Sequence, residues 1–244
     1  PEPGLAPPAE PLSVFAQLAS RMAELAGLQT EGVFRVSGSS DEADRLLTAL
    51  RAATDGDEVA GVLATCDDCH DCALVLCRWL RGQNELIPAS FYASCGNVWG
   101  AALFAAAQDG RAEDGRKAAE EFVSELPQPG QALLRAVVAH LQRVSRNADK
   151  TKMSATNLGR VFAPSFLKRT DASPEEMLRH AEPDATFVAA LVDWLERPEA
   201  EQPEPDPEPA RPVSVEVLKT SQGFGMRETD PPPSQESSGA REMS

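Results

Sequence analysis

The sequence lacks a long apolar run, an excess of positive charge and any sustained alternation typical of β-strands. No 18 consecutive residues are apolar, so we expect no membrane-spanning helix. The chain has 23 Lys and Arg against 38 Asp and Glu, which gives a net charge of −15. Phosphate-rich partners require a basic surface, so this balance argues against nucleic acid or anionic lipid as the main partner.

The sequence also lacks the features of a secretory leader. Residues 1–10 have neither the charged start nor the apolar middle of a signal peptide. Five cysteines, an odd number, without such a leader favour reduced thiols and a cytoplasmic location. Because the chain begins at Pro1, we expect it to be part of a longer chain with further domains.

Three of the cysteines follow a C-x2-C-x2-C spacing that can be read in two ways. Cys66, Cys69 and Cys72 have this spacing, with His70 between them. A zinc site needs four converging ligands, so it is the less favoured alternative. On one helix, Cys69 and Cys72 share a face with Leu76 and can pack as small apolar residues. We therefore expect no metal and no cofactor in this chain.

Apolar residues recur at three- and four-residue steps, which predicts an all-α fold. The pattern predicts helices from Pro11 to just before Gly27 and over residues 69–81, 89–107, 116–125, 131–146 and 184–196. Two more are placed by their caps: one after Ser40 or Asp41, and one after Ser154 that ends at Pro164. Residues 54–61 and 150–154 are expected to be a loop and a turn.

Composition divides the chain into three parts: a proline-rich leader, a helical domain and an acidic tail, over residues 1–10, 11–196 and 197–244. The leader and tail are expected to be disordered, since residues 198–212 alone contain six prolines. The tail has ten acidic and five basic residues, so −5 of the −15 belongs to it and −10 to the rest. The apolar cluster 213–218 is expected to be disordered, with a docking peptide as the alternative.

The stretch 27–38, GLQTEGVFRVSG, places Arg35 among small and apolar residues of an acidic chain. Glycines at 32 and 38, together with nearby serines, allow such a loop to turn tightly and protrude. Arginine keeps its charge and donates from a planar fork that suits phosphate oxygens. By itself the stretch is also compatible with an ordinary surface arginine.

Four segments in this order resemble the RhoGAP family of Rho-type GTPase-activating domains. Residues 27–38 resemble the family's arginine-finger loop. Residues 126–141, LPQPGQALLRAVVAHL, resemble its Leu-Pro-x-x-Asn-x-x-Leu-Leu helix. Residues 68–81, DCHDCALVLCRWLR, resemble the family segment Asp-x-His followed by Leu-Lys-x-Phe-Leu-Arg. Residues 152–167, KMSATNLGRVFAPSFL, resemble the family block around Asn-Leu-Ala-x-Val-Phe-Gly-Pro.

The resemblance implies an all-helical bundle that accelerates GTP hydrolysis by a Rho-family small GTPase in its GTP-bound state. It implies that Arg35 is the finger supplied to the partner, and that Asn157 holds the finger loop and touches the GTPase. Arg81 matches the arginine that braces the loop, and Lys152 matches a lysine of the last segment. Mg²⁺ and GTP would belong to the partner.

The sequence departs from the family pattern at several supporting positions. The family's GTPase-facing lysine corresponds to Cys77, and Arg78 next to it can replace the charge only if its stem curls back. Gly130 and Ser165 replace two asparagines.

The alternative function is therefore a RhoGAP-fold module that binds small GTPases or other signalling partners with little catalysis. A helical scaffold without GTPase contact is a third possibility. We expect Arg35, Arg78, Arg81, Lys152 and Arg160 to gather at the docking surface.

Overall fold

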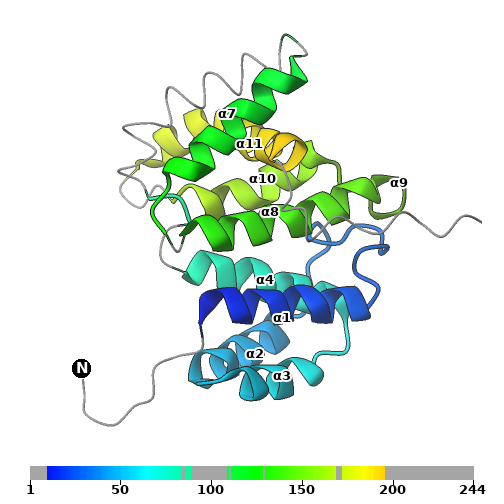
Figure 1. Cartoon of the computed structure of the whole chain (residues 1–244). Helices are drawn as coiled ribbons and strands as arrows, with labels where there is room; N and C mark the ends of the chain where they lie inside the picture. Colours follow the sequence, from blue (N-terminus) through cyan, green and yellow to red (C-terminus); the bar gives the residue numbers. More distant parts are fainter. Residues whose placement is uncertain are drawn as a thin grey trace, which may run out of the picture. The chain divides into compact units, whose positions relative to one another are not determined.

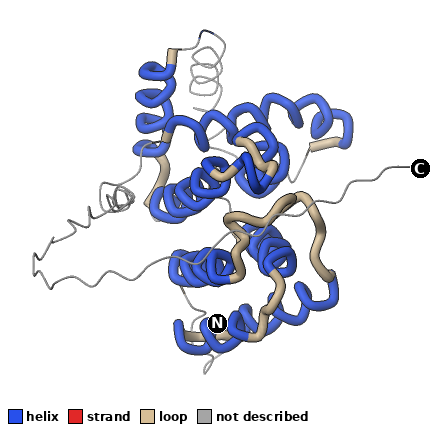
Figure 2. Tube along the Cα trace, turned by 90° about the vertical axis from the view of Figure 1, so that its right-hand side faces the viewer, coloured by secondary structure: helices blue, strands red, loops and turns tan. Residues whose placement is uncertain are grey.

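The described part of the chain is entirely helices and the loops between them. The structure is a computed structural model that describes residues 10–83, 86–88, 109, 111–128, 130–168 and 172–195. These residues belong to the first of two compact units, which divide after Gln202. Figure 2 shows no strand among them. None of the helices they form is long and apolar enough to cross a membrane. The predicted all-α fold is confirmed.

The first half contains four helices, three of which begin at a side-chain cap. They are α1 (Pro11–Glu24), α2 (Ser40–Ala52), α3 (Gly56–Ala64) and α4 (Cys69–Gly82). Ser39, Asp55 and Asp68 accept hydrogen bonds from backbone N–H groups in the first turns of α2, α3 and α4. Such caps satisfy donors that have no partner inside the helix.

The second half contains five further helices among the described residues. They are α7 (Ala112–Glu125), α8 (Gly130–Arg146), the short α9 (Ala148–Thr151), α10 (Ala155–Phe166) and α11 (Pro174–Trp194). Ser154 caps α10, as predicted, by accepting from the N–H of Asn157. Ser173 and Glu176 form a reciprocal capping box at the start of α11. The predicted helix over 89–107 lies outside the described residues.

The helices are stacked so that α1, α4 and α8 form the middle of the unit (Figure 1). Helices α2 and α3 pack against α4 and α1 on one side, while α10, α11 and α7 pack with α8 on the other. The core is apolar and its largest fully buried side chains include four phenylalanines: Phe15, Phe122, Phe162 and Phe166. Cys72 is fully buried in this core beside α1, where its thiol faces the carbonyl oxygen of Leu18.

Several predicted boundaries are wrong, and each error has a local cause. Residues 54–61 are not a loop, because Asp55 caps a helix that buries Val59 and Leu63. The cap of α2 is Ser39, one residue before the predicted Ser40 or Asp41. The predicted turn over residues 150–154 overlaps the end of α9.

Two prolines lie inside helices instead of ending them. Pro164 does not terminate α10, which continues to Phe166. Helix α11 begins at Pro174, ten residues before the predicted start, and runs through Pro183. Its first turns expose Met177 and Leu178, so they show no buried face that periodicity could detect. Buried contacts with α10 begin near Asp184, where the prediction placed the start.

Replacing Gly159 by Ala should destabilise the domain, because α11 packs directly against α10 at this glycine. A methyl group at this position would overlap the carbonyl oxygen of Ala185 and lie 3.1 Å from Cβ of Ala189. We expect a loss of about 1–3 kcal/mol in the free energy of unfolding, measured in urea. Gly61→Ala is the control: nothing lies within 4 Å of that exposed helical position, so this change should stabilise by up to ~1 kcal/mol. Equal effects of the two changes would contradict this packing.

Candidate functional site

Arg35 lies in the loop between α1 and α2, residues 25–39, which we call the Arg35 loop. The N–H of Gly32 donates to the carbonyl oxygen of Thr151 at 2.8 Å, which ties the loop to the end of α9. Figure 1 shows this loop rising from α1 towards α9. The N–H groups of Arg35 and Val36 both donate to the carbonyl oxygen of Gly32, each at 2.8 Å. The tight turn requires φ +74° at position 32, a conformation that favours glycine.

The two residues before Arg35 face inward and anchor the turn. Val33 is fully buried, and the ring of Phe34 packs edge-on against Phe162 of α10 and His140 of α8, with centroids 4.9 and 6.3 Å apart. Phe34 has φ 68°, a left-handed conformation that costs a non-glycine residue about 1–2 kcal/mol. The aromatic packing therefore holds the backbone in a strained turn directly before the arginine.

Arg35 itself lies at the surface. Its side chain is exposed, as is that of Val36, which has 49% of its surface accessible. Among the described residues, no hydrogen bond or ion pair involves the Arg35 guanidinium. The loop thus presents a permanent positive charge that no carboxylate of the described chain neutralises.

Asn157 braces the segment to which the Arg35 loop is tied. Its amide Nδ2 donates to the carbonyl oxygen of Lys152 at 3.1 Å. The preceding carbonyl, that of Thr151, accepts from Gly32. Two consecutive carbonyls therefore bind the Arg35 loop and Asn157, so the structure brings Asn157, Lys152 and the loop into one region. Lys152 has φ 57°, and its ammonium group donates to the carbonyl oxygen of Asp149.

The basic residues of α4 are placed differently from one another. Arg78 is engaged within the domain, where it donates to Asp44 at 2.7 Å and to the hydroxyl of Ser40 at 2.8 Å. Arg81 is exposed, and the described residues offer it no hydrogen bond or ion pair. Cys77 is buried, which raises the pKa of its thiol to about 12 and keeps it neutral at pH 7.

The predicted gathering of cations is only partly visible. Arg160 pairs with Glu182 at 3.2 Å on the exposed surface, a contact of small energetic value. Arg78 is held by α2, as described above. Among the described residues, no hydrogen bond or ion pair joins Arg81 to the Arg35 loop. Of the other four candidates, Lys152 directly follows Thr151, whose carbonyl accepts from the Arg35 loop, and Arg78 binds Ser40, the residue directly after the loop.

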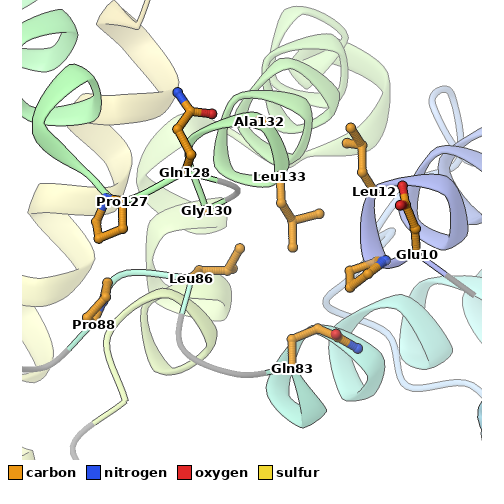
Figure 3. A pocket seen from close by; sticks show the side chains of 11 residues that line it. Glu10, Leu12, Gln83, Leu86, Pro88, Pro127, Gln128, Gly130, Ala132 and Leu133 are labelled. Carbon is orange, nitrogen blue, oxygen red and sulfur yellow. The ribbon is translucent and has the colours of Figure 1, made fainter. Parts of the chain in front are cut away.

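A cavity of about 580 Å³ lies at the other end of the middle helices (Figure 3). It is lined by residues that begin α1 and α8 and that follow α4, whereas the Arg35 loop follows the end of α1 and contacts the start of α4. The length of α1 separates the two by about 20 Å. Among the described lining residues the only charged one is Glu10, and a negative side chain does not favour a phosphate group.

The four cysteines in the described part of the chain pack as small buried side chains. Cys66, Cys69, Cys72 and Cys77 are free and buried. Within the described ranges, no group of three or more His, Cys, Asp or Glu side chains is arranged to hold a metal ion.

Comparison with known proteins assigns the family. Residues 13–171, more than half of the chain, match the sequence profile of the RhoGAP domain. The chain belongs to the RhoGAP domain family. Rho GTPase-activating protein Graf of Drosophila melanogaster is 29% identical over 190 residues, which cover 75% of this chain and 17% of Graf. Mouse Rac GTPase-activating protein 1 is 32% identical over 153 residues, 62% of this chain and 22% of that protein.

Solved structures show the same RhoGAP fold. The crystal structure of the BH domain from Graf, the GTPase regulator associated with focal adhesion kinase, has a TM-score of 0.56 at 20% identity. That match covers 75% of this chain and 92% of the other. Human Rho GTPase activating protein 15 gives a TM-score of 0.55 at 20% identity, over 73% of this chain and 79% of the other. The chain spans about a fifth of the length of the curated relatives named above.

Two residues that shape the Arg35 loop were not predicted from the sequence. Phe34 anchors the turn through α8 and α10, and Asp71 accepts a hydrogen bond from the N–H of Ser39. Helical periodicity carries no signal for a loop residue such as Phe34. Asp71 could have been noticed only as a first-turn acid of α4. Both roles depend on tertiary contacts.

The buried His140 should make the stability of the domain depend on pH. Neither ring nitrogen has a hydrogen-bond partner among the described residues, and burial lowers the pKa of His140 to about 3 from an ordinary value near 6.5. Between these values the unfolded chain binds a proton that the folded one does not, so acidification favours unfolding by about 1.4 kcal/mol per pH unit. From pH 7 to pH 5 we expect His140 to contribute a loss of ~2 kcal/mol in the free energy of unfolding. In urea titrations, His140→Leu should reduce the pH dependence by that amount; an unchanged dependence would contradict the assignment.

Proposed function

We propose that this RhoGAP domain accelerates GTP hydrolysis by a Rho-family small GTPase, with Arg35 inserted into the active site of the partner. The observation that carries the proposal is the exposed Arg35, without an ion-pair partner in the described chain, at a turn fixed by Gly32 and Phe34. The relatives support the same activity, since their names describe GTPase-activating proteins.

The proposed mechanism is electrostatic. When the γ-phosphoryl group is transferred to water, negative charge redistributes over its oxygens and the bridging oxygen to the β-phosphate. A guanidinium placed beside these oxygens stabilises the charge that develops, and it does so most effectively in a cleft from which water is excluded. Arg35 remains charged throughout and donates in a planar fork, so it needs no proton transfer of its own.

In this proposal the chemistry takes place on the partner. Mg²⁺, GTP and the attacking water belong to the GTPase, and this domain supplies charge and position without a cofactor. The stabilisation grows as charge develops, so binding should be tightest to a transition-state mimic, weaker to the GTP form and weakest to the GDP form. A cytoplasmic location of the domain is part of the same proposal.

Asn157 and Lys152 have supporting roles in the same proposal. Asn157 holds the carbonyl of Lys152, and the adjoining carbonyl of Thr151 holds Gly32. This arrangement would restrain the Arg35 loop and place an exposed ammonium group beside it. We propose that both residues also line the surface that meets the GTPase. Arg81, exposed on α4, is proposed to contact the partner, since it forms no hydrogen bond or ion pair with the described residues of the Arg35 loop.

One observation favours the alternative of a module that binds with little catalysis. The resemblance implies a GTPase-facing lysine at position 77, and the structure has a buried, neutral cysteine there. Arg78 does not replace the lysine, because Ser40 and Asp44 hold its guanidinium. A finger that is less well supported can lose about 10²-fold in rate through a small misplacement.

Single-turnover hydrolysis by a panel of Rho-family GTPases loaded with GTP would distinguish the possibilities. The proposal predicts acceleration of at least one member by the wild-type domain, saturable in domain concentration. Binding to GTP-loaded GTPases without acceleration would establish the alternative instead. Absence of both binding and acceleration across the panel would leave only the helical-scaffold reading.

A further inference from the structure

Two side chains of α4, Asp71 and Arg78, contact the junction between the Arg35 loop and α2: Asp71 binds Ser39, the last residue of the loop, and Arg78 binds Ser40, the first residue of α2. A carboxylate oxygen of Asp71 accepts a hydrogen bond from the backbone N–H of Ser39 at 2.5 Å. Arg78 donates to the hydroxyl of Ser40 at 2.8 Å and to its carbonyl oxygen at 3.4 Å. Seven residues separate Asp71 from Arg78, so they lie two turns and about 10 Å apart along one face of α4.

The same face of α4 is in direct contact with Gly38. A methyl group at position 38 would lie 2.6 Å from the backbone nitrogen of Asp71 and 2.7 Å from its Cα. Only a residue without a side chain can therefore approach α4 so closely. The close approach brings the N–H of Ser39 within reach of the Asp71 carboxylate.

Arg78 connects this contact to α2. Besides Ser40, its guanidinium binds the carboxylate of Asp44 at 2.7 Å, one turn further along α2. Ser39 in turn caps α2 by accepting from the N–H of Glu42. The start of α2, where the Arg35 loop ends, is thus fixed to α4 at two points.

We propose that Asp71 and Arg78 form a clamp that positions Arg35 by fixing the C-terminal end of its loop. The proposal rests on the function proposed above. Gly32 and Phe34 fix the other end through Thr151 and the aromatic core. Seven residues separate Gly32 from Ser39, so restraint at both ends leaves the exposed Arg35 little freedom to swing. The clamp supports the finger loop from α4, the helix on which Cys77 replaces the supporting lysine.

The clamp stabilises the position of the loop and does not act through its own charge, so the variants are chosen to separate these two effects. Asp71→Ala removes the acceptor for the Ser39 N–H, whereas Asp71→Asn loses the charge and keeps one amide oxygen that can accept the same hydrogen bond. Asp41→Ala is the matched control, because it removes an equal charge from the first turn of α2, and the Asp41 carboxylate forms no hydrogen bond or ion pair with the described residues of the loop. Arg78→Lys keeps the charge but loses the planar fork that spans Ser40 and Asp44.

Two readouts are measured on each variant: amide hydrogen exchange at Ser39 and Arg35 in the free domain, and kcat and KM of stimulated GTP hydrolysis. For Asp71→Ala we expect at least tenfold faster exchange at Ser39 and about a tenfold or greater fall in kcat, with KM changed less than twofold. Arg78→Lys should lower kcat in the same direction. Asp71→Asn should retain most of the protection and kcat, and Asp41→Ala should match the wild type.

The outcomes separate the clamp from the proposed function. If Asp71→Ala leaves both exchange and kcat at wild-type values, or if Asp41→Ala lowers kcat equally, the clamp is refuted. Faster exchange with unchanged kcat would also refute it, because the bond would then hold the loop without positioning Arg35. If the wild-type domain accelerates no GTPase, the proposed function fails, and unchanged exchange would still refute the clamp by itself.

Discussion

Replacement of Arg35 by Ala is expected to abolish nearly all of the acceleration that the domain gives to its GTPase. The guanidinium is exposed, no ion pair engages it within the described residues, and a braced turn presents it to solvent. Removing an arginine finger typically lowers the stimulated rate by ~10³–10⁵, equivalent to about 4–7 kcal/mol in the barrier. The measurement is single-turnover GTP hydrolysis at a saturating concentration of the domain.

Two further variants separate the finger from general charge effects. Arg35→Lys keeps one positive charge but loses the planar fork, so we expect it to recover little of the rate. Arg51→Ala removes the same charge from an exposed position near the other end of α2, about 16 Å along the helix from Ser40, and should leave the rate unchanged. Wild-type acceleration by Arg35→Ala would contradict the finger.

Replacement of Phe34 by Ala should have the second-largest effect, on both activity and stability. The Phe34 ring packs against Phe162 and His140 and holds the backbone at φ 68° directly before Arg35. Without the ring the turn is free to relax, so we expect kcat to fall by about 10²-fold while binding to the GTP-loaded GTPase weakens little. Loss of the half-buried ring should also cost about 2–3 kcal/mol in the free energy of unfolding.

Comparison of Phe34→Ala with Phe34→Gly tests the strained backbone separately. Both changes remove the ring, but only glycine adopts a positive φ without penalty. If the left-handed conformation persists, Phe34→Gly should be more stable than Phe34→Ala by about 1 kcal/mol in urea denaturation, although glycine normally costs entropy. An alanine variant that is as stable and as active as the wild type would show that the aromatic anchor has no role.

The sequence predicted most helices because their buried faces repeat regularly. The patterns over residues 69–81 and 131–146 correspond closely to α4 and α8, since each buries one continuous face. Helix α3 was missed because its glycines and acids resemble a loop, although Asp55 and Glu58 carry a capping signal. Periodicity alone could not show that α11 begins ten residues earlier, because its first turns have no partner to bury them.

The candidate site was accessible from sequence only through family resemblance. That resemblance identified Arg35 and Asn157. In the structure the loop that carries Arg35 binds the carbonyl of Thr151, and Asn157 binds the next carbonyl, that of Lys152. The resemblance did not predict which basic side chains form ion pairs within the domain. Arg78, for example, pairs with Asp44, which lies 34 residues away in sequence. Contacts of this kind depend on the packing of α2 against α4, which no local pattern specifies.

The most direct test of the account is to measure how Arg35 contributes to affinity in different states of the nucleotide. The partner GTPase would be loaded with GDP alone, or with GDP and a planar metal fluoride that mimics the phosphoryl group in transfer. We predict that the wild-type domain binds the mimic-loaded form at least 10²-fold more tightly than the GDP form, and that Arg35→Ala loses this difference. Equal affinity of wild type and Arg35→Ala for the mimic-loaded form would contradict the claim that Arg35 stabilises charge in the active site of the partner.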